Sequence, residues 1–298
     1  MTVVFTHWSV SWPALGCYAV VAVAHLAGLR LAAANGTTGR ERARAAMAFQ
    51  AGLLLALLCL VSPIGYWSDI YLWVRAVQFI LLAVGATGLM VLGAPWQALG
   101  RAIQPRSGGA GQQHEQPVPG MQGPENRPLW LLRRPAAAIT AVNVVWFGWQ
   151  LPVLYDSAQH NSAVALAGHA SCLAAGLVFW LQLIGSRPLA PVASPLRRLK
   201  LVVASVGTTT IFGMVLVFGN GVLYPAYANH WHHLMTVLDD QQLSGAVLWM
   251  GMLPALIIVA VSLLMSWLSE EESAELSAGL DRLLKPRKSA WSARPGIR

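Results

Sequence analysis

The sequence predicts an all-α membrane protein: a bundle of seven transmembrane helices with the N-terminus outside and the C-terminus in the cytoplasm. Hydrophobic residues make up 56% of the 298 residues and charged residues only 11%, whereas about one quarter of a soluble protein is charged. Seven apolar stretches approach the roughly 20 residues that cross a bilayer, and Lys and Arg fall almost entirely in alternate loops. These observations exclude an ordinary cytosolic enzyme.

The expected spans follow one another as runs rich in Ala, Val, Leu and Gly, with Trp near many of their ends. They cover approximately residues 12–29, 45–62, 70–94, 135–155, 161–185, 201–222 and 243–268. One formal charge, Arg75, lies within them. No Lys or Arg precedes the first span, while Arg40, Arg42 and Arg44 follow it, so we expect neither a cleavable signal nor an N-in anchor.

The distribution of basic residues fixes the expected orientation. With the N-terminus outside, 19 of the 20 Lys and Arg residues fall on the cytoplasmic side. The outer loops contain none and instead carry Asp69, Asp156, Asp239 and Asp240. Because cytoplasmic loops of membrane proteins are enriched in Lys and Arg, this split supports seven spans. It also accounts for the net charge of +8 without a nucleic-acid partner.

The parts outside the bilayer are expected to be small. Residues 1–268 form the membrane domain and residues 269–298 a cytoplasmic tail, which begins acidic and ends basic. Residues 100–128 are rich in Gly, Pro and Gln, which predicts a disordered cytoplasmic linker. The three cysteines lie in apolar runs, which favours packing residues over a disulfide framework.

Polar side chains enter several spans at a similar depth, near the outer end. Such groups cost free energy in hydrocarbon, so their positions are informative. With a rise of about 1.5 Å per residue, Arg75, Gln150 and His169 all fall in the outer half of their spans. We expect one polar layer there, formed by Arg75, Gln78, Gln150, His169, Asp239, Asp240, Gln241 and Gln242, with Cys17 and Cys59 at the same depth.

These residues also have simpler structural interpretations. Arg75 can extend to the outer surface and pair with Asp69, or it can form an ion pair within the membrane with Asp239 or Asp240. The latter two can instead provide the N-cap and first-turn charge of the seventh helix. His169 is either hydrogen bonded to a neighbouring helix or a metal ligand.

The outer loop before the seventh span has the highest density of metal-ligating side chains. It contains His230, His232, His233 and Met235, whose imidazole and thioether donors suit copper or zinc. The same spacing occurs in pH-sensitive or merely solvated loops. Metal binding here is a hypothesis, with His169 as a further candidate ligand inside the spans.

Five segments, taken in order, carry a resemblance to a known family. They are VLGAP (Val91 to Pro95), WQLPVLYD (Trp149 to Asp156), GHASCLAAGLVFWLQL (Gly168 to Leu183), YPAYA (Tyr224 to Ala228) and DDQQLSGAVLW (Asp239 to Trp249). In this order they resemble the polytopic CtaG family of bacterial cytochrome c oxidase assembly factors. The last segment is the most specific, being similar to the family's DQQxAGxxMW. The resemblance implies a seven-span protein of the bacterial plasma membrane that contacts oxidase subunits and handles copper.

The chain departs from the family where the family has membrane histidines. The family's HMxQH in the third span is replaced by a segment that starts at Arg75 and keeps only its glutamine, as Gln78. WHxP is replaced by WQLP, with Gln150, and EH by Gly168 and His169. An arginine has only donors and a permanent charge, so it cannot ligate copper. The resemblance therefore implies a divergent member in which a fixed cation replaces the metal's charge.

The predicted function is an assembly or maturation factor for haem-copper cytochrome c oxidase, assisting copper delivery on the outer face. One alternative is a membrane transporter for copper or another small solute, which needs a polar path through the inner half. Another is a haem- or quinone-binding subunit, which needs facing histidines, but His25 and His169 fall in opposite halves. Enzyme activity is not predicted, because the spans contain no nucleophile–base pair and no carboxylate dyad.

Overall fold

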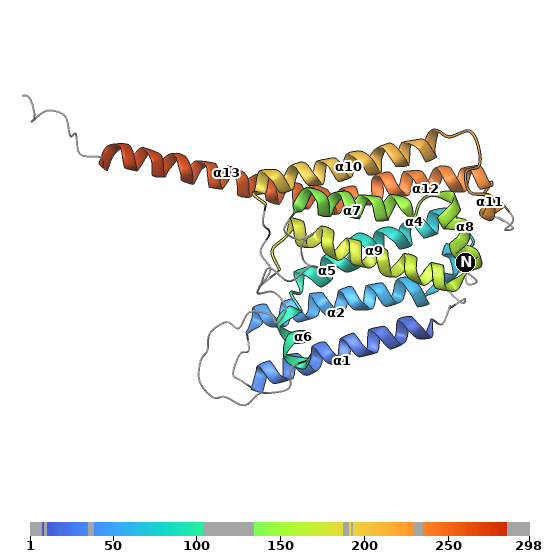
Figure 1. The fold of residues 1–298 in the computed structure, drawn as a ribbon, viewed down its shortest axis with the longest axis horizontal. Helices are drawn as coiled ribbons and strands as arrows, with labels where there is room; N and C mark the ends of the chain where they lie inside the picture. Colours follow the sequence, from blue (N-terminus) through green and yellow to red (C-terminus); the bar gives the residue numbers. More distant parts are fainter. Residues whose placement is uncertain are drawn as a thin grey trace, which may run out of the picture.

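The described part of the chain is an array of long helices that lie side by side (Figure 1). The computed structural model describes residues 8, 11–34, 39–103, 134–186, 191, 193–228 and 235–284. Apolar runs form helices in hydrocarbon because a helix satisfies its backbone hydrogen bonds within itself. The all-helical class expected from the sequence is confirmed.

Four of the expected spans are single helices. They are α1 (Trp12–Ala34), α2 (Arg40–Val61), α9 (Ser162–Leu183) and α10 (Pro195–Phe218). Both α2 and α10 begin earlier than the apolar run alone suggested, because helical geometry continues through the basic residues that precede it. In α10 the first helical residue is a proline, whose fixed φ suits that position.

Two spans are built from consecutive helical segments. The third consists of α4 (Leu72–Ile80), the π-helix η2 (Leu81–Ala86) and α5 (Thr87–Leu92). The last consists of α12 (Val237–Gly251) and α13 (Leu253–Leu284), and α13 continues past residue 268, where the tail was expected to begin. The sequence did not predict η2. Single π-turns within α-helices are frequent at functional sites.

The fourth span is broken. It consists of α7 (Pro135–Gly148) and α8 (Pro152–His160), whose axes differ in direction by 62°. Pro152 lacks the N–H that would continue the helical ladder, so the helix ends before it. Six helical segments are long and apolar enough to cross a membrane singly, and the bent pair makes seven. The described residues thus hold six candidate spans, or the expected seven if the bent pair α7–α8 is one span.

Three short helices connect the spans: α3 (Pro63–Ser68), α6 (Trp96–Ile103) and α11 (Pro225–Ala228). Helix α6 packs against α1, where Gly28 lets the Ala98 backbone approach. Because α6 runs to Ile103, the first residues of the expected 100–128 linker are helical. Residues 104–133 lie outside the described part of the chain.

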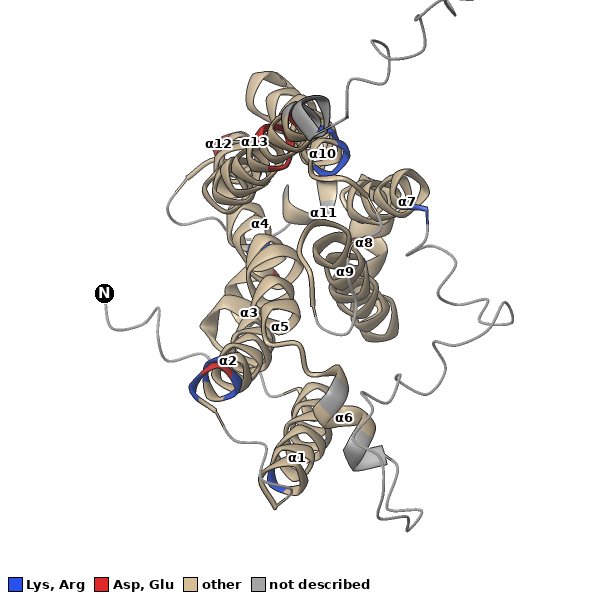
Figure 2. Ribbon diagram, turned by 90° about the vertical axis from the view of Figure 1, so that its left-hand side faces the viewer, with Lys and Arg blue, Asp and Glu red and all other residues tan. Residues whose placement is uncertain are grey.

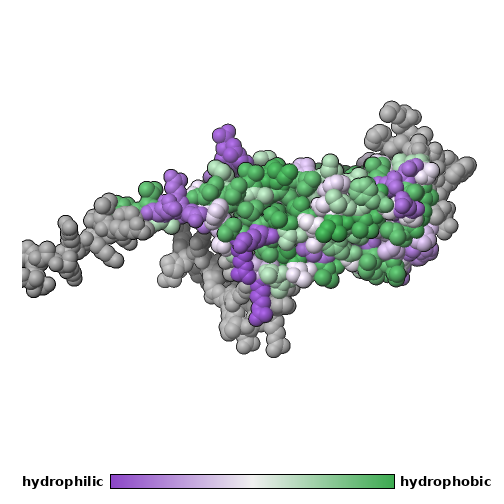
Figure 3. Space-filling view, turned by 90° about the horizontal axis from the view of Figure 1, so that it is seen from above, coloured by the Kyte–Doolittle hydropathy of each residue, from purple (hydrophilic) through white to green (hydrophobic). Residues whose placement is uncertain are grey.

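The two ends of the bundle differ in charge. Figure 2 looks onto one end and shows Lys and Arg residues of α1, α2, α7 and α10 there. We call this the basic end, and the opposite end, which holds α8 and α11 in Figure 1, the α8 end. The flank between them is largely apolar (Figure 3). Among the described Lys and Arg residues, Arg75 is the one that lies inside a span, away from the basic end.

Candidate polar cavity at the α8 end

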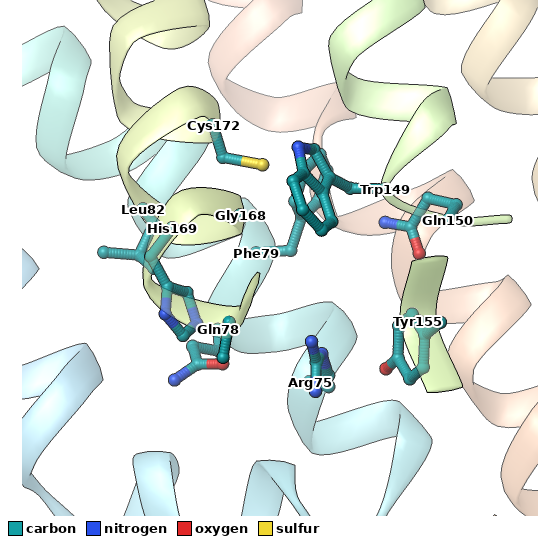
Figure 4. Close-up of a pocket in the computed structure, with 11 residues that line it drawn as sticks. Arg75, Gln78, Phe79, Leu82, Trp149, Gln150, Tyr155, Gly168, His169 and Cys172 are labelled. Carbon is teal, nitrogen blue, oxygen red and sulfur yellow. The ribbon is translucent and has the colours of Figure 1, made fainter. Parts of the chain in front are cut away.

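A cavity of about 40 Å³ lies among α4, η2, the α7–α8 break, α8 and α9. Four residues of the predicted polar layer line it together, namely Arg75, Gln78, Gln150 and His169. Figure 4 shows how they are arranged around the space. The rest of its wall is supplied by Phe79, Leu82, Trp149, Tyr155, Ala165, Gly168 and Cys172. The structure thus brings these four residues of the predicted layer into one site.

Arg75 provides the cationic group of this cavity. Its Nη1 lies 4.0 Å from Oδ1 of Asp69, with the two side chains 16% and 67% exposed. Its guanidinium carbon lies 4.2 Å from the centre of the Tyr155 ring, a cation–π contact. Of the two interpretations of Arg75, the structure supports the ion pair with Asp69. Because Asp69 is mostly exposed, that pair compensates the charge only weakly.

Asp240 has a different partner from the one expected. Its Oδ2 accepts the backbone N–H of Leu72 at 2.8 Å, and its Oδ1 accepts that of Trp73 at 3.0 Å. The first N–H groups of a helix have no partner within the helix. Asp240, which is only 1% exposed, therefore caps α4 from α12, one turn before Arg75.

The neighbours of Asp240 in sequence also stabilise this end. Asp239 forms a capping box with Thr236, the N-cap of its own helix. Gln241 accepts the backbone N–H of Leu223 at 2.7 Å and donates to the Gly221 carbonyl at 3.0 Å. The segment 239–241 therefore joins α12 to α4 and to the loop that precedes α11. Gln242 is partly exposed and does not line the cavity.

Three tyrosines, Tyr155, Tyr224 and Tyr227, add further hydrogen bonds at the α8 end. They were not among the predicted site residues. The Tyr224 hydroxyl donates to the backbone carbonyl of Gln150 at 2.7 Å. This carbonyl lies in the α7–α8 break, so it is not used by a helical hydrogen bond. The Tyr227 hydroxyl donates to the Ser68 carbonyl at 2.8 Å and lies 3.3 Å from that of Tyr155. Burial raises the pKa of Tyr224 and of Tyr227, so both remain protonated donors. The signals in the sequence were the YPAYA segment for Tyr224 and Tyr227 and the WQLPVLYD segment for Tyr155.

Two polar side chains in the cavity make no hydrogen bond to another described residue: the Gln150 amide and the His169 imidazole. Gln150 is buried, at 9% exposure. The adjacent Trp149 is fixed, since its Nε1 donates to Ser171 at 2.7 Å and its ring packs against Gly168. The interpretation of His169 as a bundle histidine bonded to a neighbouring helix is thus not supported among the described residues.

The cavity does not suit copper. In the described part of the chain no three His, Cys, Asp or Glu side chains are grouped so that they could hold a metal ion. The cavity offers only His169 and Cys172 beside the permanent cation Arg75, which repels a metal cation. His230, His232 and His233 lie outside the described residues, and Met235 immediately precedes the N-cap of α12.

These features define the class of the protein as a multi-pass helical membrane protein with a polar site inside its spans. The sequence model of the family described as cytochrome c oxidase caa3 assembly factor (Caa3_CtaG) matches residues 23–270. The chain therefore belongs to this family of cytochrome c oxidase assembly factors, as the resemblance indicated. The match includes every element around the cavity. No curated protein and no solved structure matched the chain.

Proposed function

We propose that the protein is an assembly factor for haem-copper cytochrome c oxidase in the bacterial plasma membrane, with its basic end in the cytoplasm. The observation that carries the proposal is the family match over residues 23–270, together with the convergence of the family-like segments. WQLPVLYD, YPAYA and DDQQ meet at the α8 end, where they hydrogen bond to one another or to the start of α4.

The assembly factor acts by contact with an oxidase subunit. The α8 end supports this role because it is pre-organised: Asp240, Gln241, Tyr224 and Tyr227 hold together segments that are far apart in sequence. A surface fixed in this way loses little conformational freedom on binding, which favours association. The proposed partner surface is therefore the α8 end, on the outer side of the membrane.

Copper delivery is the finer part of the proposal, and it rests on the outer loop rather than on the cavity. Arg75 makes the cavity unsuitable for a metal cation. The clustered donors of the chain on the proposed outer side are His230, His232, His233 and Met235. Imidazoles bind copper in the neutral form, so we expect loading of this loop to fall as the pH drops below about 6.

A transporter gains no support from the interior. From the cavity towards the basic end, α7, η2 and α9 present buried apolar side chains. Val84, Trp146 and Phe179 belong to this core, and Phe179 is fully buried. His25 near the basic end is hydrogen bonded to Gln50 at 3.0 Å and does not line the cavity. A polar path across the bundle is not formed by these residues.

The test is genetic complementation with two separate measurements. A strain lacking the gene receives the wild-type chain, a variant with His230, His232 and His233 changed to Ala, or the control His160→Ala. His160 is an exposed histidine at the end of α8. We expect wild type and control to restore oxidase activity and the copper-to-haem ratio of the purified oxidase.

The triple variant separates the two parts of the proposal. It should restore oxidase protein but give a lower copper-to-haem ratio. Full copper loading with the triple variant would refute copper delivery by the loop. Normal oxidase activity in the strain lacking the gene would refute the assembly role itself.

A further inference from the structure

We propose that the cavity beside Arg75 binds a small carboxylate, a compact monoanion such as formate or acetate. Three observations point to this ligand: a cation with a weak partner, two buried or half-buried polar groups without a partner, and an adjoining space of matching size. Each is argued from the described residues alone.

The charge of Arg75 requires an anion nearby. Its ion pair with Asp69 spans 4.0 Å, and the Asp69 side chain is 67% exposed, so water screens that interaction. Tyr155 stacks against the guanidinium and the Tyr227 hydroxyl hydrogen bonds to it, but neither tyrosine carries a charge. The carboxylate of Asp240 is engaged with the backbone of α4. In the low dielectric of the spans, a cation whose charge is only partly compensated attracts a further anion.

Gln150 and His169 supply the polar groups that an anion would satisfy. Neither side chain hydrogen bonds to another described residue, and the polar atoms of both keep accessible surface that a ligand in the cavity can contact. Both face the same space as the Arg75 guanidinium in Figure 4. A ligand that accepts from the Gln150 amide and from an imidazole N–H restores these bonds while it neutralises Arg75.

The size and shape of the space select a small carboxylate. A volume of about 40 Å³ has room for about three water molecules, which suits formate or acetate better than a larger acid such as benzoate. The guanidinium presents its N–H groups as a planar fork that matches two carboxylate oxygens. The Phe79 and Trp149 rings in the wall can take the methyl group of acetate.

The test is direct binding by the full-length protein in detergent micelles. The buffer contains a bulky sulfonate as its anion, and formate, acetate, chloride or benzoate is added. Isothermal calorimetry and the thermal unfolding midpoint report binding. We expect saturable binding of formate and acetate, weaker binding of chloride, and no response to benzoate. This measurement does not involve oxidase, so its outcome is independent of the assembly role.

Two pairs of matched variants locate the site. Arg75→Gln should weaken acetate binding by about tenfold or more, whereas Arg134→Gln, an exposed arginine at the basic end, should not. His169→Leu should weaken it by several-fold, whereas His160→Leu should not. His169→Leu leaves the charge of Arg75 in place, so this variant tests the site even if Arg75→Gln fails to fold.

The proposal is overturned if acetate shows no saturable binding to the wild-type protein. It is also overturned if His169→Leu binds acetate as the wild type does. Equal affinity for chloride and acetate would refute the assignment to a carboxylate.

Discussion

Asp240 shows how one side chain can organise two spans. The N-terminal N–H groups of α4 have no acceptor within the helix, and the carboxylate of Asp240 accepts two of them from α12. Its negative charge also interacts favourably with the positive end of the helix dipole. The cap fixes α4 in the position that places Arg75 at the cavity.

Replacement of Asp240 should therefore be much more costly than replacement of its neighbour. We expect Asp240→Ala to lower the free energy of unfolding by about 3 kcal/mol, because two charge-assisted bonds are lost and buried donors remain unpaired. Asp239→Ala should cost about 1 kcal/mol or less, since its capping contacts are exposed. Thermal unfolding midpoints of the two purified variants provide the measurement. A smaller loss for Asp240→Ala than for Asp239→Ala would contradict the assigned cap.

The ion pair of Arg75 is expected to be weak despite its place in a span. A double-mutant cycle with Arg75→Gln and Asp69→Asn should give a coupling energy of about 1 kcal/mol or less, because Asp69 is exposed and the contact is long. Denaturant titration in mixed micelles gives the four free energies. A coupling of several kcal/mol would show that Asp69 neutralises Arg75 fully and leaves no role for an anion.

At the scale of the elements, the sequence predicted the spans better than their interruptions. Residues 135–155 read as one apolar run and were predicted as a single span, although α8 begins at Pro152 after a break. The π-helix Leu81–Ala86 had no composition signal. Such a turn depends on how neighbouring helices pack, and periodicity in one chain segment does not contain that information.

Helix η2 lies close to α9 at Gly176. A Cβ on Gly176 would meet the Ala83 carbonyl oxygen of η2 and would lie 2.7 Å from Thr87 Oγ1. Small residues allow transmembrane helices to approach closely. Gly176→Ala should thus cost about 1–3 kcal/mol through overpacking.

Gly207→Ala in α10 is the matched control, because no atom lies within 4 Å of its Cβ position. Alanine has a higher helix propensity than glycine, so Gly207→Ala should stabilise the protein by about 0.5–1 kcal/mol. Unfolding midpoints of both variants should therefore move in opposite directions. A midpoint for Gly176→Ala at or above that of the wild type would contradict the close contact.

The candidate site was predictable in its depth but not in its contacts. A rise of about 1.5 Å per residue places Arg75, Gln150 and His169 at similar depth, and the structure brings them to one cavity. The same reasoning grouped Asp240 with them, although its carboxylate binds the backbone of α4. The sequence identifies polar groups that are costly in hydrocarbon, whereas their partners depend on helix rotation and packing.

At the scale of the whole molecule, charge separates the two ends of the bundle. Arg30, Arg40, Arg134 and Lys200 lie in or next to α1, α2, α7 and α10, and Figure 2 shows the basic residues of these helices at one end of the bundle. The opposite end carries the capped helix starts and the buried tyrosine network. Because basic residues are retained on the cytoplasmic side, this asymmetry predicts the orientation of the protein in the membrane.

Cysteine labelling of intact cells tests that orientation. In a Cys17→Ser background, which removes the exposed native thiol and leaves Cys59 and Cys172 buried, a probe cysteine replaces Ser162 or Ser194. Both serines are exposed; Ser162 begins α9 at the α8 end, and Ser194 is the N-cap of α10 at the basic end. A membrane-impermeant maleimide should label Ser162→Cys directly and Ser194→Cys only after permeabilisation. Labelling of both cysteines in intact cells would contradict the seven-span topology. Labelling of Ser194→Cys alone in intact cells would place the proposed contact surface, the cavity and the histidine loop on the cytoplasmic side.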